Sequence, residues 1–278
     1  MIGAPVSDPA RFKPDNRRAG SETGAPTPVH PRNKREYLRD LVAAKYKAFR
    51  PLTEEERALG FLGWHQRGYL PHCDYPWLTQ FVTFRLADSM PATRRTEWDH
   101  FLKIEDVRDR RTKLEEYLDR GVGECRLRNL GIARLAEETL LHFHNDRYEL
   151  LAWCVMPNHI HALVHVWQTP LGQMIQSWKR FIATNAEAAQ TERRSPTRRV
   201  SNEPINTPAR RAVLQWEREY WDTFMRDEEQ EKKAVRYIEN NPVKANLCRV
   251  PEQWEFSSAR FRDGYRRLVL PRMPNPTR

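Results

Sequence analysis

Two apolar runs joined by a very short connection constrain the fold of this chain more than any other feature. Residues 147–156, RYELLAWCVM, and residues 160–166, IHALVHV, each have the length and the Leu, Val and Ile content of a β-strand. Only the sequence Met-Pro-Asn-His joins their apolar parts. Parallel strands need a crossover of a dozen or more residues, so a link this short predicts an antiparallel hairpin within a sheet.

His159 immediately precedes the second run, and His161 is its second residue. Side chains of a strand alternate between its faces, so both imidazoles are predicted on one face and Ile160 on the other. Two imidazoles on one face form a bidentate platform for a divalent metal ion. Taken alone, this spacing favours a packing role. The similar pair His142 and His144 ends an apparent helix, and we assign it a structural role.

Further elements are expected on both sides of the hairpin. Their order is strand, long helical insert, strand, strand, helix, strand, helix, which predicts an α+β fold: a ferredoxin-like sandwich with an antiparallel sheet backed by helices. The expected elements are a strand at 78–88, a charged helical insert at about 92–145, a helix opened by Thr169 and Pro170, a strand at 213–225, and a helix at 227–241 that Pro242 ends.

The remaining segments are expected to lie outside this sandwich. Residues 1–33 contain six prolines and no apolar periodicity, so we expect a disordered tail. Residues 34–67 are expected to form a helical extension, with an amphipathic helix at 35–49 and a capping box at Thr53 and Glu56. The predicted organisation is completed by a domain at 68–262, a basic loop at about 191–212 within it, and a basic C-terminal tail at 263–278.

Charge and composition narrow the class of protein. The chain has 47 Lys and Arg against 37 Asp and Glu, a net charge of +10, so a polyanion such as nucleic acid is the expected partner. No apolar run approaches the ~20 residues of a membrane span, and the N-terminal segment lacks the apolar core of a signal peptide. We therefore expect a cytoplasmic protein. Its four cysteines are too scattered for a zinc knuckle and are interpreted as free thiols.

A second pair of polar residues lies in the sequence RYIENNPVK. Tyr237 and Asn241 are four residues apart and are therefore neighbours on one helical face. Asn241 offers a carbonyl oxygen, and Tyr237 offers a phenolic oxygen that can attack phosphorus when a metal polarises the phosphate. Both also have structural interpretations, because Tyr237 could pack in the core and Asn241 precedes Pro242, where helices commonly stop.

Five segments in a fixed order resemble a known family. They are MPNHIHALV, LGQMIQSWKRFIA, REYWDTFMRDEEQ, RYIENNPVKANLC and PEQWEFSSARF. In this order they resemble the REP-associated tyrosine transposases, which belong to the insertion-sequence-200-like group, over roughly residues 68–262. One departure is Leu214-Gln215-Trp216, where relatives usually have Leu-Trp-Gln. The change falls on none of the four candidate residues.

The resemblance implies an HUH active site, in which two histidines flank a hydrophobic residue. His159 and His161 would be metal ligands, Asn241 the third ligand and Tyr237 the nucleophile, with Mg²⁺ or Mn²⁺ as cofactor. The implied activity is a single-stranded DNA endonuclease and strand transferase that acts on hairpin or REP-like palindromes through a 5′-phosphotyrosine intermediate in bacterial DNA transposition. Both monomers and homodimers occur in this wider group, so the oligomeric state stays open.

The sequence also offers basic side chains for DNA contacts and a rival function. Basic side chains are candidates for DNA contacts, with a solvated surface as the alternative: Lys179, Arg180, Arg193, Arg194, Arg198 and Arg199. The rival function is a domesticated DNA-binding regulator that keeps the fold without cleavage. A phosphoesterase with paired His-x-Thr/Ser motifs is excluded, because no histidine is followed two residues later by Thr or Ser.

Overall fold

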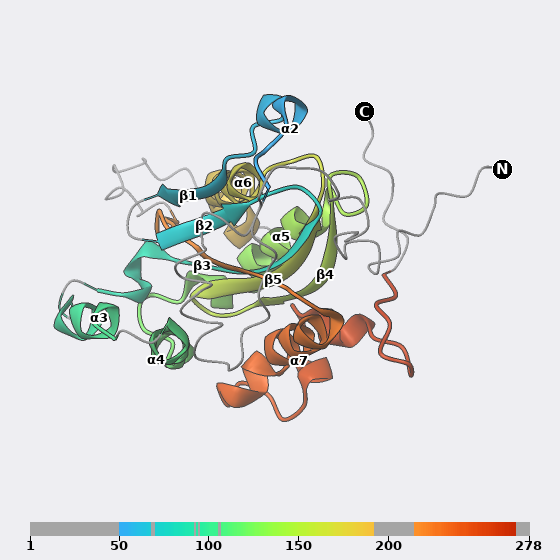
Figure 1. Ribbon diagram of the computed structural model, residues 1–278. Helices are drawn as coiled ribbons and strands as arrows, with labels where there is room; N and C mark the ends of the chain where they lie inside the picture. The colour runs from blue at the N-terminus through green and yellow to red at the C-terminus, as the bar shows by residue number, and fades with distance from the viewer. Residues whose placement is uncertain are drawn as a thin grey trace, which may run out of the picture. The chain divides into compact units, whose positions relative to one another are not determined.

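A four-stranded antiparallel sheet is the centre of the computed structural model of the chain (Figure 1). Its spatial order is β4-β5-β3-β6, with the bounds β3 Leu78–Arg85, β4 Tyr148–Val155, β5 His159–Val166 and β6 Trp221–Phe224. The structure describes residues 50–67, 70–91, 93, 95–104, 107–191 and 214–270. The expectations for residues 1–33 and 35–49, and nearly all of the basic loop at 191–212, lie outside these residues.

The hairpin predicted from the two apolar runs is confirmed. Strands β4 and β5 pair antiparallel, with Val155 opposite Ile160. The turn is closed by a hydrogen bond from the Met156 N–H to the His159 carbonyl at 2.9 Å. Strand β5 also pairs with β3 along its full length, from Leu78–Val166 to Arg85–His159. This central position fixes the register of β5 from both sides.

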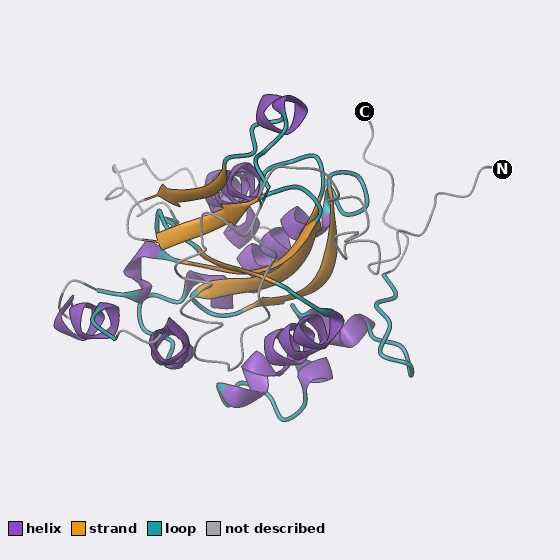
Figure 2. Cartoon of the chain, viewed as in Figure 1, coloured by secondary structure: helices purple, strands orange, loops and turns teal. Residues whose placement is uncertain are grey.

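Helices cover both faces of the sheet, as the α+β prediction requires (Figures 1 and 2). Helices α5 (Leu130–Leu141) and α6 (Leu171–Thr191) pack on one face, where Ile160, Val164 and the other even-numbered β5 residues are buried. Helix α7 (Glu228–Lys244) packs on the opposite face through Ala234 and Ile238, which contact a core cluster containing Leu163. The two faces therefore have separate cores.

The segment between β3 and β4 is helical, as predicted. It contains α3 (Arg95–Leu102), α4 (Val107–Asp119) and α5, and Leu114, Tyr117 and Leu118 of α4 are buried. Among the described residues, no helix combines the length and the apolar character needed to cross a bilayer. Short 3-10 helices complete the fold at Ala87–Ser89, Arg126–Arg128, Pro251–Gln253 and Ser258–Phe261.

The strand predicted at 213–225 is shorter than expected. Residue 213 lies outside the described residues, and regular pairing is confined to Trp221–Phe224 at the edge of the sheet. The preceding segment makes an isolated bridge from Trp216 to Leu86 instead. The Lys179 ammonium group donates to the carbonyls of residues 217, 218 and 219 at 2.8–3.3 Å. Lys179 thus satisfies these three carbonyls without a neighbouring strand. The sequence pattern did not reveal this, and the predicted strand was therefore too long.

Helix α7 continues through Pro242 to Lys244, so the prediction that Pro242 ends it was wrong. Proline removes one helical N–H. In the last turn that loss is small, because the following N–H groups keep their partners: Ala245 N–H donates to Asn241 and Leu247 N–H donates to Pro242, each at 2.9 Å. Pro242 is also buried, which stabilises the extra turn.

A second, two-stranded hairpin was missed by the sequence analysis. The capping box at Thr53 and Glu56 is present, but helix α2 spans only Glu54–Ala58. Gly60 then has a φ of 94°, a left-handed conformation that favours glycine and turns the chain away from the helix. Strands β1 (Gly63–Arg67) and β2 (Leu70–Asp74) follow as an antiparallel pair.

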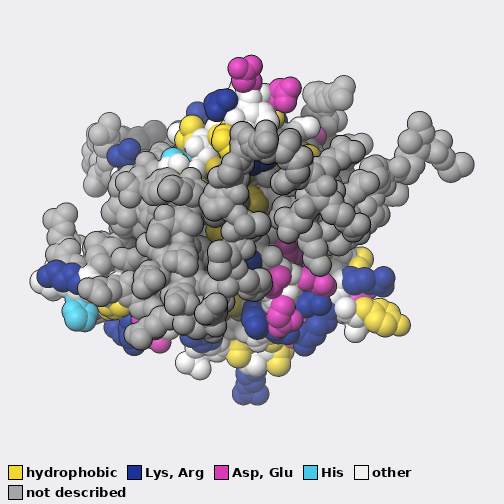
Figure 3. Space-filling view, viewed as in Figure 1, with side chains coloured by type: hydrophobic (Ala, Val, Ile, Leu, Met, Phe, Trp, Pro, Cys, Tyr) yellow, Lys and Arg dark blue, Asp and Glu magenta, His cyan; other side chains and the backbone are white. Residues whose placement is uncertain are grey.

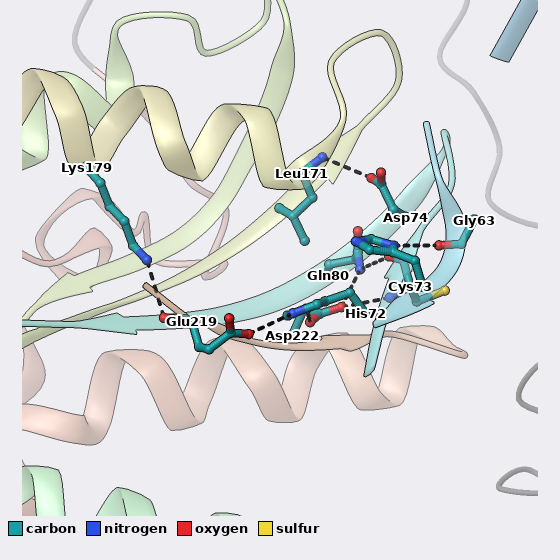
Figure 4. A network of polar contacts seen from close by, with 10 residues as sticks. Gly63, His72, Cys73, Asp74, Gln80, Leu171, Lys179, Glu219 and Asp222 are labelled. Carbon is teal, nitrogen blue, oxygen red and sulfur yellow. Dashed lines mark hydrogen bonds and ion pairs between the residues drawn. The ribbon is translucent and has the colours of Figure 1, made fainter. Parts of the chain in front are cut away.

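Buried polar contacts join this hairpin to the main sheet (Figure 4). The His72 Nδ1 atom lies 2.5 Å from an Asp222 carboxylate oxygen, and its Nε2 atom lies 3.5 Å from Glu219. Asp222 also accepts the Cys73 N–H at 3.1 Å. Asp74 accepts the Leu171 N–H at the start of α6 at 3.2 Å. Burial alone would lower the pKa of His72, but Asp222 and Glu219 raise it above its usual value.

This arrangement predicts a pH-dependent stability. Because the pKa of His72 is raised in the folded state, protonated His72 stabilises the fold fully below its unfolded pKa of about 6.5, and this contribution is lost as the pH rises through the folded value. Removing one partner of a buried pair costs about 3–5 kcal/mol. His72→Gln should therefore lower the free energy of unfolding at pH 6, measured by urea denaturation, and should flatten its decrease above pH 6.5.

The exposed His142 provides the control, since His142→Gln should leave the free energy of unfolding unchanged. Equal stability of wild type and His72→Gln at pH 6 would contradict the role assigned to the buried pair.

Candidate active site between strand β5 and helix α7

Strand β5 places His159 and His161 on the sheet face that α7 covers, as the two-residue spacing predicted. Both side chains are buried, with exposed fractions of 1% and 0%. Their Nε2 atoms lie 3.0 Å apart. Both rings therefore present the same nitrogen to the same point, rather than packing separately into the core.

The outer nitrogens of the two rings are held by polar side chains of the protein. The Nδ1 atom of His159 lies 2.8 Å from Asn158 Oδ1. The Asn158 amide group donates to the carbonyls of Leu118 and Val122, which leaves its oxygen as an acceptor. His159 must therefore carry its proton on Nδ1, and its Nε2 has a free lone pair. Burial lowers the pKa of His159 well below its usual value, and His161 adds to the shift.

The second ring has a partner that permits either tautomer. The Nδ1 atom of His161 lies 2.8 Å from the Thr83 hydroxyl of strand β3. A hydroxyl can both donate and accept. When His161 donates from Nε2 to His159, Thr83 donates to Nδ1. When a cation takes both Nε2 lone pairs, His161 can carry its proton on Nδ1 and donate to Thr83. The pair can thus change to a chelating form without moving a strand.

Helix α7 brings Tyr237 and Asn241 to the same side of the sheet. The Tyr237 ring centroid lies 5.8 Å from that of His161 and 5.8 Å from that of Phe81. The Asn241 amide nitrogen lies 3.5 Å from the Tyr237 hydroxyl. Asn241 is 1% exposed, and its Oδ1 atom is buried with no hydrogen-bond partner among the described residues. A buried acceptor of this kind is costly unless another group satisfies it.

The donor set fits a divalent cation. Two ligands at about 2.1 Å from an ion, at a right angle to each other, are separated by about 3 Å, which matches the distance between the two Nε2 atoms. The outer Nδ1 atoms are held by Asn158 and Thr83, the support that metal-ligating histidines commonly have. Among the described residues, no cluster of three or more His, Cys, Asp or Glu could hold a metal. The Asn241 amide oxygen, which is buried without a partner among the described residues, stays the candidate third ligand that the family resemblance implied.

Two acidic residues of the helical insert also reach α7 and were missed by the sequence analysis. The Tyr237 hydroxyl donates to Glu115 Oε2 at 2.7 Å. One turn further along α4, Asp119 lies 3.2 Å from the Lys244 ammonium group. Burial raises the pKa of Asp119, and Lys244 opposes that shift. In the sequence these carboxylates look like part of a charged helix, so no local pattern distinguishes them.

The candidate DNA-binding residues are only partly described. The Lys179 ammonium group lies on the main-chain carbonyls of residues 217–219, and Arg180 is exposed. The loop arginines Arg193, Arg194, Arg198 and Arg199 lie outside the described residues. On α7, Lys232 and Lys233 pair with Glu228 and Glu229, so basic and acidic side chains are interspersed there (Figure 3 shows both kinds on one face).

Two other candidates lie apart from the histidine pair. His144 accepts the Leu150 N–H at 3.0 Å, which agrees with the structural role predicted for it. Tyr220, an alternative nucleophile in the sequence, is buried in the core cluster that contains α5 and α6 residues, on the opposite face of the sheet. Its ring lies 4.4 Å from that of His72.

Comparisons with known proteins give one similarity and no family assignment. No family model matches the chain, and no curated protein does. Among solved structures, the chain is similar to a REP-associated tyrosine transposase bound to a REP hairpin. The TM-score is 0.38 and the identity 17%, over 72% of this chain and 85% of that chain. These values are too low to transfer a function, and the site has to be judged on its own geometry.

The geometry predicts a positioning role for Asn158, which is fully buried and joins β5 to the insert. Asn158→Ala should lower the free energy of unfolding by about 2 kcal/mol or more, because it leaves two carbonyls and the His159 Nδ1 without their partner. Chemical denaturation gives this value. The variant should also lose the slowly exchanging His159 Nδ1 proton in nitrogen-resolved NMR spectra.

Asn240 on α7 is the matched control. Its amide also donates to a main-chain carbonyl, that of Arg236 at 2.8 Å, but the residue is exposed. Asn240→Ala should change stability by less than about 0.5 kcal/mol. Similar losses in both variants would show that Asn158 has no special role.

Proposed function

We propose that this chain is a metal-dependent single-stranded DNA endonuclease and strand transferase, a transposase of the single-tyrosine HUH type. One observation carries the proposal: α7, from a distant segment, places the Tyr237 ring 5.8 Å from that of His161 and the Asn241 amide nitrogen 3.5 Å from the Tyr237 hydroxyl, on the sheet face where the two Nε2 atoms meet. The five ordered sequence segments that resemble the REP-associated tyrosine transposases support the same function. Packing alone explains neither the two facing imidazole nitrogens nor the buried Asn241 oxygen without a partner among the described residues.

His159, His161 and Asn241 would hold Mg²⁺ or Mn²⁺, with two nitrogen ligands favouring manganese. When bound, the ion supplies positive charge to the oxygens of the scissile phosphate. The protein contributes a preorganised donor set, because Asn158 and Thr83 fix the orientation of both rings before DNA arrives. The low pKa of His159 keeps that ring neutral, and therefore able to act as a ligand, near pH 7.

Tyr237 would act as the nucleophile. Its oxygen attacks the phosphorus in line, the phosphate becomes attached to the tyrosine through its 5′ side, and the leaving strand ends in a 3′-hydroxyl. The covalent bond conserves the energy of the phosphodiester, so a 3′-hydroxyl can reverse the step on another strand without ATP. Tyr237 is partly exposed, whereas the two histidines are buried. Partial exposure is consistent with a side chain that has to contact a phosphate of the DNA.

The partner would be single-stranded or hairpin DNA. The net charge of +10 supports a polyanionic partner, and binding should weaken as salt rises. The family resemblance favours a REP-like palindrome. Arg180 and the four loop arginines remain candidates for backbone contacts. The family resemblance favours a bacterial cytoplasmic location.

Replacing Tyr237 by phenylalanine tests the proposed function. Tyr237→Phe removes one oxygen and keeps the ring that contacts His161 and Phe81, so folding and DNA affinity should change little. Wild type incubated with Mn²⁺ and hairpin single-stranded DNA should form a protein–DNA adduct that survives a denaturing gel. The Phe variant should form none, a loss of at least about 1,000-fold.

Tyr220→Phe is the matched control, because it removes the same oxygen on the other face of the sheet. It should form the adduct at the wild-type rate. An adduct that persists in Tyr237→Phe would assign the nucleophile elsewhere. Tight binding of a cognate hairpin by wild type without any cleavage would favour the rival function, a DNA-binding regulator.

A further inference from the structure

We propose that Glu115, in the helical insert, is a catalytic residue that accepts the proton of Tyr237 when the tyrosine attacks phosphorus. The inference rests on the proposed function and adds a residue that the motifs do not contain. Its basis is a direct contact, because the Tyr237 hydroxyl donates to Glu115 Oε2 at 2.7 Å. A general base has to lie within hydrogen-bond reach of the proton that it removes, and this distance meets that condition.

The environment of Glu115 is unusual for a residue of a charged helix. The residue is 8% exposed and follows the buried Leu114 in α4. Burying a carboxylate is costly unless it is hydrogen-bonded or paired. A more exposed neighbour, Glu116, shows the ordinary alternative, since it pairs with the solvent-exposed Lys113 at 3.1 Å. The position of Glu115 is therefore better explained by its contact with Tyr237 than by solubility.

A second contact holds α4 in register with α7. Glu115 and Asp119 are four residues apart on α4, and Tyr237 and Lys244 are seven residues apart on α7. Both spacings place the partners on one helical face. The Asp119–Lys244 ion pair at 3.2 Å thus gives α4 and α7 a second contact, one turn of α4 beyond the Glu115–Tyr237 hydrogen bond. The helical insert, which the proposed function otherwise leaves without a role, becomes part of the active site.

The proposed step forms one bond to phosphorus, breaks another and moves the Tyr237 proton. The bond from Tyr237 Oη to phosphorus forms, and the Tyr237 proton moves to Glu115 Oε2. The bond from phosphorus to the 3′ oxygen of the leaving strand breaks, and that oxygen keeps the electron pair and takes a proton from solvent. In the reverse step a 3′-hydroxyl attacks the phosphotyrosine, loses its proton to solvent, and the protonated Glu115 returns a proton to the Tyr237 oxygen. No oxidant or reductant is needed.

The test compares single-turnover adduct formation by wild type, Glu115→Gln and Glu115→Ala, using the full chain, Mn²⁺ and a hairpin oligonucleotide. Glu115→Gln keeps the shape and can still accept a hydrogen bond, but it cannot take up a proton at neutral pH. Its rate should fall about 100-fold or more, with DNA affinity and thermal stability near those of wild type. Glu115→Ala should be as slow, and added sodium acetate should restore much of its rate.

Acetate rescue separates a proton acceptor from a structural role, because a small carboxylate can replace a missing base but cannot refold a displaced helix. The matched control is Glu116→Gln, which removes a carboxylate that is 41% exposed on the same helix and should leave the rate unchanged. Acetate should not affect it.

The outcomes distinguish this inference from the proposed function. If wild type forms no adduct, the proposed function fails and the inference fails with it. If wild type forms the adduct and Glu115→Gln forms it equally fast or faster, the proposed function stands and the base assignment is wrong. If Glu115→Gln is slow only because it unfolds, Glu115→Ala decides: acetate rescue of its folded fraction supports the assignment, and no rescue overturns it.

Discussion

The site depends on one buried contact, the approach of the Nε2 atoms of His159 and His161 to 3.0 Å. Burying two imidazoles almost completely costs free energy, because each ring carries two polar nitrogens that need hydrogen-bond partners. The protein satisfies the outer nitrogens with Asn158 and Thr83 and directs the inner ones at each other. The central position of β5, paired on both sides, maintains that geometry.

Other parts of the structure can be understood as support for this contact. Helix α7 closes the face of the sheet that carries the histidines and brings Tyr237 and Asn241 beside them. The helical insert reaches the same place twice, through the Asn158 hydrogen bonds to Leu118 and Val122 and through Glu115 on Tyr237. The opposite face, with α5, α6 and the Val and Ile side chains of β5, supplies an apolar core. Stability and chemistry are thereby assigned to different faces of one sheet.

The sequence predicts those parts of the fold that depend on local periodicity. The alternation of β5 and its short link to β4 were enough to place the two histidines on one face. The four-residue spacing of Tyr237 and Asn241 was enough to place them on one side of a helix. The α+β order of elements followed from the same patterns. Each of these relations spans only a few residues, where strand and helix geometry leave little freedom.

Relations between distant segments could not be predicted in this way. Glu115 is 122 residues from Tyr237, and nothing near Glu115 in the sequence distinguishes it from the more exposed Glu116. The β1–β2 hairpin was missed because its docking depends on His72, which meets Asp222 150 residues later. The end of α7 was wrongly predicted for a related reason. Proline commonly ends an isolated helix, but here the burial of Pro242 and the hydrogen bonds of the last turn stabilise the helix beyond it.

The central claim is that the histidine pair and the Asn241 oxygen form one metal site beside Tyr237. Anomalous X-ray scattering from crystals grown with Mn²⁺ tests it most directly, because it locates the ion without any variant. We expect an anomalous peak within about 2.3 Å of both Nε2 atoms and of the Asn241 amide oxygen. A peak held by Glu115 and Asp119 away from the imidazoles, or no peak at the histidines at a saturating Mn²⁺ concentration, would contradict it.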